Sequence, residues 1–263
     1  MAQAEGGRKV RGRGRGRRVW RIVLVVVLIA AAYGIGVGQS IVVRPPLVLG
    51  QDAVTDAQSA TATVTLDDVG GQVIHVAPTG VRKLVFVFYP GGLVRPQAYE
   101  WLGRALSADG IETWIPVMPF DLAVTGIDRA DAIIAHVGNV PVVMGGHSLG
   151  GAMAADYASK HADKLVGMVL CAADPASNVT VAASWPVLSL RAERDGVAAA
   201  ADVQGGLDRL PAGSKIVTIE GSVHAFFGRY GPQQGDGTPT VARADAEKQI
   251  VAAIATYLAS IAG

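Results

Sequence analysis

Short apolar runs alternate with segments of helical periodicity along most of the chain after residue 60. Residues 83–89, KLVFVFY, are almost continuously apolar and precede Pro-Gly-Gly, as expected for a strand buried on both faces. The predicted strands are 61–66, 72–76, 83–89, 112–118, 141–145, 165–172, 187–192 and 215–219, and the predicted helices are 96–109, 127–136, 150–160, 202–210 and 242–262.

This order of elements predicts an α/β fold with a mostly parallel sheet and helices on both faces. The first two strands, separated by the turn residues 67–71, are expected to form a hairpin. Ligands of such sheets bind beyond the carboxyl ends of the strands. The functional site is therefore expected in the loops that follow residues 89, 118, 145, 192 and 219.

The first sixty residues have a different pattern. Residues 22–43 are 22 consecutive uncharged residues, beginning with a strongly apolar stretch. A helix of that length reaches roughly 33 Å, enough to cross a hydrocarbon core of about 30 Å. We therefore interpret residues 22–43 as a transmembrane signal-anchor helix and residues 44–60, which begin RPP, as a linker to a domain spanning residues 61–263.

Charge supports this topology. Residues 1–21 hold eight of the 23 basic residues and one of the 22 acidic residues, which leaves 15 basic and 21 acidic residues and a net charge of −6 for the rest. The positive-inside rule then places the basic arm 1–21 in the cytoplasm and the folded domain outside it. A cleaved signal peptide, a twin-arginine export signal at Arg17-Arg18 and an RNA-binding arm are the alternatives; for the last, attraction to anionic lipids is the simpler account.

Composition excludes several classes of protein. Half of the residues are hydrophobic, so the chain is not globally disordered, and the acidic body has no nucleic-acid footprint. Cys171 is the single cysteine, which excludes a disulfide framework and a Cys-rich metal site. No H-E-x-x-H or EF-hand pattern occurs, so no metal is expected.

The chemistry is carried by Gly146-His147-Ser148-Leu149-Gly150, which lies between a predicted strand and a predicted helix. This is the context of a nucleophile elbow, in which a tight turn presents the serine hydroxyl above the sheet edge. Glycines two positions before and after Ser148 avoid collisions with the strand and the helix. The alternative is a glycine-rich turn whose serine only caps the helix.

A serine nucleophile needs a base and a group that orients the base. His224 is the candidate base because it follows the predicted strand 215–219 at the expected edge. His147 lies inside the elbow, where its ring is expected to point away from Ser148, and the remaining histidines are His75, His136 and His161. Asp195 is the favoured orienting acid because the Asp-Gly turn can direct a short carboxylate at the His224 loop. Glu193 and Asp174 are its rivals.

Two backbone N–H groups are needed for the developing oxyanion. Leu149, which follows the nucleophile, is expected to supply one. Gly92, in the loop after residues 83–89, is expected to supply the other, with Leu93 as its nearest rival.

At this point residues 61–263 resemble the α/β-hydrolase superfamily, with the chain order Ser148, Asp195, His224. The Pro-Gly-Gly loop at 90–92 and the stretch 224–231, HAFFGRYG, are similar to the compact dienelactone hydrolase and bacterial carboxylesterase group. The resemblance implies an eight-stranded sheet, no cofactor and a Ser-His-Asp acyl-enzyme mechanism. Dienelactone hydrolases carry a cysteine where this chain has Ser148, so lactone specificity is not implied.

The gap between the predicted strands 165–172 and 187–192 is too short for a helical cap, which predicts an open site. Its rim is expected to include Trp185, Phe226, Phe227 and Tyr230, with burial in the core as the alternative, and residues 231–240 are expected to form a flexible polar loop near His224. The leading hypothesis is a membrane-anchored serine hydrolase acting on uncharged acyl esters. An acyltransferase with an alcohol acceptor and a non-catalytic lipid- or partner-binding domain are the alternatives; the oligomeric state is left open.

Overall fold

A computed structural model describes residue 34, residues 47 and 49, and residues 62–262. The chain divides into two units, and every element below belongs to the second, Leu47–Gly263. Within the described residues, no helix is both long and apolar enough to span a membrane. The predicted arm 1–21, nearly all of the predicted span 22–43 and most of the linker 44–60 lie outside the described residues.

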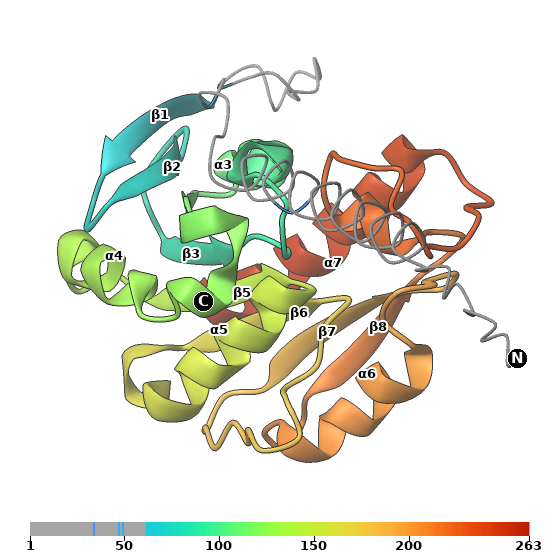
Figure 1. Cartoon of the computed structure of the whole chain (residues 1–263). Coiled ribbons are helices and arrows are strands. Elements are labelled where there is room, and N and C mark those ends of the chain that lie inside the picture. The colour runs from blue at the N-terminus through green and yellow to red at the C-terminus, as the bar shows by residue number, and fades with distance from the viewer. Residues whose placement is uncertain (1–33, 35–46, 48, 50–61, 263) are drawn as a thin grey trace, which may run out of the picture. The chain divides into compact units, whose positions relative to one another are not determined.

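Eight strands form one sheet in the order β1-β2-β4-β3-β5-β6-β7-β8 (Figure 1). The strands are β1 (Thr63–Asp68), β2 (Gln72–Ala77), β3 (Leu84–Tyr89), β4 (Ile111–Pro116), β5 (Val142–His147), β6 (Gly167–Cys171), β7 (Val187–Ala192) and β8 (Lys215–Ile219). Strand β2 pairs antiparallel with β1 and β4, and all other pairs are parallel. The prediction of a mostly parallel, eight-stranded sheet that begins with a hairpin is confirmed.

Helices cover both faces of the sheet, as predicted (Figure 1). They are α3 (Glu100–Ser107), α4 (Arg129–Val137), α5 (Leu149–Lys160), α6 (Ala200–Gly206) and α7 (Arg243–Ala262). Residues of α3 and α7 belong to one apolar core, and residues of α4 and α5 belong to the other. The predicted helix 96–109 begins as a 3₁₀ turn at Pro96–Tyr99 and continues as α3.

Strand β3 shows why the centre of the sheet is stable. All six of its residues are buried. Phe86 and Phe88 lie in the core under α3 and α7, whereas Val85 and Val87 lie in the core under α4 and α5. Because successive strand side chains point to opposite faces, an uninterrupted apolar run supplies both cores at once.

Two details of the chain path concern the edge of the sheet where the parallel strands end. Strand β5 continues to His147, two residues beyond the predicted end at 145, so Ser148 follows the strand directly and α5 begins at the next residue. Residues 173–186, between β6 and β7, contain no helix. The described chain therefore has no helical cap between β6 and β7, in agreement with the short gap between the predicted strands.

Candidate active site

Ser148 occupies the sharp turn between β5 and α5. Its backbone has φ 51° and ψ −125°, and its N–H donates to the carbonyl oxygen of Cys171 at 2.9 Å. A positive φ is uncommon for a residue with a side chain and indicates local strain that the surrounding structure must hold in place. The packed strand β6 supplies that support through Cys171.

The two glycines of the motif are required by space. A Cβ atom at Gly146 would collide with the backbone of Gly150 and Gly151. A Cβ atom at Gly150 would collide with the carbonyl oxygens of Tyr89 and Pro90. Helix α5 therefore approaches both β5 and the loop after β3 more closely than any side chain would allow, which is the geometry that the sequence motif predicted.

His224 and Asp195 come together from the loops after β8 and β7. Nδ1 of His224 lies 2.9 Å from Oδ2 of Asp195, and the two side chains are 1% and 3% exposed. The other carboxylate oxygen, Oδ1, accepts hydrogen bonds from the N–H groups of Val197 and Ala198 at 2.8 and 2.7 Å. The carboxylate is thus fixed by its own loop and presents one oxygen to the imidazole.

The rival acids have other partners. Glu193 accepts a hydrogen bond from the N–H of Gly221 at 2.6 Å. Asp174 pairs with Arg209 at 2.8 Å, and burial raises the pKa of its carboxyl group despite this partner. Within the part of the chain that the structure describes, neither rival bonds to His224.

Ser148 and His224 form no hydrogen bond with each other in the described part of the chain. Nε2 of His224 is buried and has no hydrogen-bond partner there. Because Nδ1 is already engaged by Asp195, Nε2 is the ring atom available to accept a proton. Catalytic hydrogen bonds are often long or poorly aligned without substrate, so this arrangement is compatible with a base that engages the hydroxyl during turnover.

The imidazole ring of His147 packs beside that of His224. Their ring centroids are 4.5 Å apart, and Nδ1 of His147 lies 2.9 Å from the hydroxyl oxygen of Tyr99. Complete burial lowers the pKa of His147 well below its usual value, and the nearby charge of His224 lowers it further. His147 is therefore a neutral structural neighbour of His224.

The predicted oxyanion loop lies against the start of α5. A Cβ atom at Gly92 would lie 3.1 Å from Cδ2 of Leu149, so the two residues are in close contact. Among the described residues, the N–H groups of Gly92 and Leu149 have no hydrogen-bond partner, whereas the N–H of Leu93 donates to the carbonyl oxygen of Asp121 at 2.7 Å. This difference favours Gly92 over Leu93 as a donor to a ligand.

The expected aromatic rim is largely wrong. Phe226 and Phe227 are 9% and 2% exposed and belong to the core, because the turn after β8 packs back against the sheet. Trp185 is partly buried and donates to the carbonyl oxygen of Ala162, beyond the far end of α5. Tyr230 does border a cavity of about 250 Å³, which it shares with Leu93.

The exposed apolar side chains near this edge include Leu93, in the loop after β3, and Phe120, in the loop after β4. Leu93 and Phe120 are 54% and 51% exposed, and both have positive φ angles, 60° and 57°. The bond between Leu93 and Asp121 holds their loops together. Since exposed apolar groups on strained backbone gain nothing for folding, these side chains are candidates for contact with a substrate.

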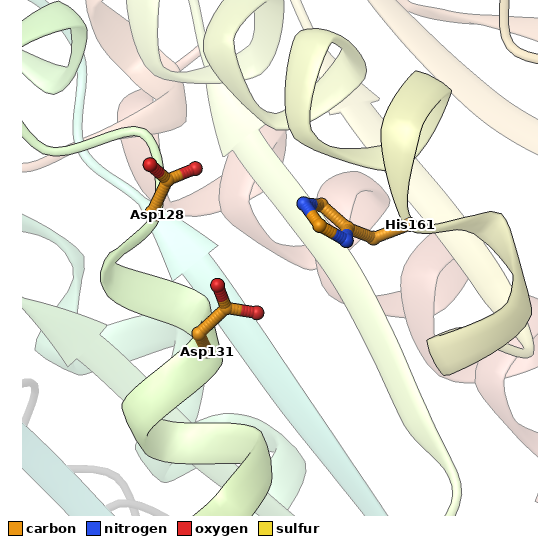
Figure 2. A group of neighbouring side chains, drawn as sticks. All are labelled: Asp128, Asp131 and His161. Carbon is orange, nitrogen blue, oxygen red and sulfur yellow. The ribbon is translucent and has the colours of Figure 1, made fainter.

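One group of side chains has the composition of a metal site. The ligand atoms of Asp128, Asp131 and His161 all lie within 4.8 Å of one another (Figure 2). However, Oδ1 of Asp131 already accepts hydrogen bonds from Lys164 at 2.8 Å and from Tyr157 at 2.7 Å.

His161 follows the end of α5, whose 12 residues span about 18 Å from the Ser148 turn. This group is therefore separate from the candidate active site.

Two residues of the site were missed by sequence reasoning. Tyr99 contacts His147, and Asp236 accepts a hydrogen bond from the N–H of His224. Tyr99 is one of several apolar residues on a helical stripe, and Asp236 stands between two glycines in a loop. The Gly-Asp-Gly sequence signals a turn, but nothing local signals which loops it joins.

Comparison with known proteins gives three findings. A family model described as the alpha/beta hydrolase family matches residues 85–249. No curated protein matches the chain. Among solved structures, a predicted CIB-like hydrolase from Thermoplasma acidophilum has 17% identity and a TM-score of 0.56, covering 75% of this chain and 97% of that chain. Est1E from Butyrivibrio proteoclasticus has 12% identity and a TM-score of 0.57, covering 76% and 98%.

Proposed function

Since this chain belongs to the alpha/beta hydrolase family, we propose that it is a serine hydrolase that cleaves carboxylic esters through Ser148, His224 and Asp195. The observation that carries the proposal is the buried contact of 2.9 Å between Asp195 and His224 at the edge where Ser148 stands on a strained turn. A buried carboxylate on Nδ1 leaves Nε2 as the proton acceptor, which is the arrangement a serine nucleophile requires.

The reaction proceeds in two halves. Oγ of Ser148 attacks the ester carbonyl carbon while its proton passes to Nε2 of His224. The tetrahedral intermediate then collapses, the bond to the alcohol oxygen breaks, and the alcohol leaves with that proton. In the second half, water gives a proton to His224 and attacks the acyl-enzyme, and the proton returns to Oγ of Ser148 as the carboxylic acid is released.

Asp195 and the two backbone N–H donors stabilise the charges that develop during the reaction. The Asp195 carboxylate holds the proton of His224 on Nδ1 and stabilises the imidazolium that forms in each half-reaction. The N–H groups of Gly92 and Leu149 stabilise the oxyanion, and their lack of other partners in the described structure supports this role. No cofactor or metal takes part in these steps.

The surroundings of the site support an uncharged ester as the substrate. The segment 173–186 contains no helix that could cover the site, and Leu93 and Phe120 expose apolar surface beside Gly92. An acyl group with an apolar chain would bury this surface. Water is the proposed acceptor.

Substitution of the nucleophile tests the proposal. Ser148→Ala should lower turnover of p-nitrophenyl acetate by four to six orders of magnitude and should abolish labelling by a fluorophosphonate probe. Mass spectrometry of the labelled wild-type protein should locate the adduct on Ser148. Undiminished activity of the variant would refute the proposal, and product analysis with an added alcohol would detect acyl transfer instead of hydrolysis.

We also propose that residues 22–43 anchor the protein in the membrane, with residues 1–21 in the cytoplasm and the hydrolase domain on the other side. The proposal rests on the uncharged length of 22–43 and the basic residues before it. A reporter that matures only outside the cytoplasm, fused after residue 60, should be active. Activity of a cytoplasm-specific reporter at the same position would overturn this orientation.

A further inference from the structure

The loop at residues 231–240 does not behave as a free polar loop, because Asp236 binds several backbone groups. Its Oδ1 accepts hydrogen bonds from the N–H groups of His224 at 3.0 Å, Gly196 at 3.3 Å and its own neighbour Gly237 at 2.8 Å. Its Oδ2 accepts from the N–H of Ala225 at 2.9 Å. The expectation of a flexible segment is therefore wrong at Asp236.

These bonds join the two loops that carry the candidate acid and base. Gly196 directly follows Asp195 in the loop after β7, and His224 and Ala225 lie in the loop after β8. Asp236 comes 40 residues after Gly196 and 12 after His224. His224 is thus held by two carboxylates: Asp195 binds its imidazole, and Asp236 binds its backbone.

The backbones of the loop after β7 and the segment 235–238 pack closely against each other. A Cβ atom at Gly196 would collide with the carbonyl oxygen of Gly235, and one at Gly237 would collide with that of Arg194. Nε of Arg194 also donates to the carbonyl oxygen of Thr238 at 2.6 Å. Residues 235–238 therefore run in backbone contact with residues 194–196, and Asp236 is at the centre of that contact.

We propose that Asp236 is a positioning residue that sets the distance between Asp195 and His224. This inference rests on the proposed function, because it concerns the same acid and base. Hydrogen bonds from backbone N–H groups to a carboxylate are charge-assisted and strong. When they are lost, the N–H groups of His224 and Ala225 lose their shared acceptor, and the bond from the N–H of Arg194 to the carbonyl oxygen of Ser222 still joins the two loops at a greater distance from the imidazole along the chain. A displacement of about 1 Å at a reacting group can cost about a hundredfold in rate.

The experiment compares Asp236→Ala and Asp236→Asn with a matched control. Asp68 also accepts a backbone hydrogen bond, from Gly71 at 2.9 Å, but it lies in the β1–β2 hairpin. Asp236→Ala should lower kcat on p-nitrophenyl acetate by about ten- to a hundredfold and change KM less than about twofold. Asp236→Asn keeps one acceptor oxygen and should recover part of kcat, whereas Asp68→Ala should leave kcat unchanged.

A double-mutant cycle separates positioning from general stability. If Asp236 acts through the contact between Asp195 and His224, adding Asp236→Ala to Asp195→Asn should lower kcat by less than about threefold. A further loss as large as that of Asp236→Ala alone would overturn the inference, as would a kcat for Asp236→Ala equal to that of Asp68→Ala.

Folding and the main proposal are checked separately. Thermal unfolding gives the folded fraction of each variant; if Asp236→Ala does not fold, Asp236→Asn alone must show a lowered kcat at unchanged KM, and a wild-type kcat for it refutes the inference. Retained activity in Ser148→Ala would refute the proposed function itself. Loss of activity in Ser148→Ala with full activity in both Asp236 variants would refute only the positioning role.

Discussion

The hydroxyl oxygen of Tyr99 lies 2.9 Å from Nδ1 of His147 and also accepts a hydrogen bond of 2.9 Å from the N–H of Gly91. The tautomer of His147 decides which of the two groups donates in this contact. Burial raises the pKa of Tyr99 and lowers that of His147, so both groups stay neutral. One hydroxyl thus connects the strand before Ser148 with the loop that contains Gly92.

Tyr99→Phe should therefore lower both the free energy of unfolding and kcat. The variant leaves the buried N–H of Gly91 without its acceptor, which should cost about 1–3 kcal/mol of unfolding free energy. It also loosens the loop that presents the N–H of Gly92, so kcat should fall several-fold. Chemical denaturation and steady-state kinetics measure the two effects.

Tyr257→Phe is the matched control for this prediction. The hydroxyl of Tyr257 also accepts a backbone N–H, from Met168 at 3.1 Å, and donates to the carbonyl oxygen of Pro186 at 2.6 Å. These groups lie at the starts of β6 and β7, at the opposite edge of the sheet from Ser148. This variant should lose stability but keep kcat, and equal kcat values in the two variants would contradict the proposed link to the loop.

Asp195→Asn should lower kcat by about four orders of magnitude while the protein stays folded, because an amide no longer holds the proton of His224 on Nδ1. Hydrolysis of p-nitrophenyl acetate provides the measurement. Glu193→Gln and Asp174→Asn are the controls, since these acids bind Gly221 and Arg209 instead. A larger loss in either control than in Asp195→Asn would transfer the orienting role to that residue.

Phe120→Asn should separate stability from substrate preference. Asparagine tolerates the positive φ of 57° better than phenylalanine does, so thermal stability should be equal or higher. The variant removes exposed apolar surface beside the candidate oxyanion loop, so kcat/KM should fall more for a hexanoate ester than for an acetate ester.

Val81→Ser provides the control for Phe120, because Val81 is 84% exposed and precedes β3 at the opposite edge of the sheet. It should leave the ratio of the two kcat/KM values unchanged. A ratio that is also unchanged in Phe120→Asn would show that the acyl chain does not contact this side chain.

Glu112 should make stability depend on pH in the acidic range. Burial alone would raise the pKa of its carboxyl group, but hydrogen bonds from His75 and Arg82, each at 2.9 Å, outweigh burial and lower it. A lowered folded-state pKa means that the ionised group stabilises the fold above the unfolded value of about 4.3, and that this contribution is lost as pH falls through the folded-state pKa.

Urea denaturation between pH 6 and pH 3 tests this prediction. The difference in unfolding free energy between the wild-type protein and Glu112→Gln should be largest at the upper end of the range and should shrink below about pH 4.3. A difference that grows on acidification would contradict the lowered pKa.

The sequence alone determined the helices and strands and which loops follow the carboxyl ends of the strands. Its periodicity predicted β7 and β8 with the bounds observed, because period-2 and period-3.6 patterns reflect burial within one segment. The glycine spacing around Ser148 identified the elbow, since close backbone approach excludes side chains at those two positions. The expected sheet topology then predicted that the loops containing Asp195 and His224 lie at the same edge of the sheet as Ser148.

Only the tertiary structure decided which side chains meet within and between these loops. Asp195, rather than Glu193 or Asp174, contacts His224, and Phe227 turns into the core instead of forming a rim. Tyr99 and His147 are 48 residues apart in the chain, and Asp236 and Gly196 are 40 residues apart. Such contacts depend on how irregular loops pack across neighbouring strands, and no local pattern records that packing.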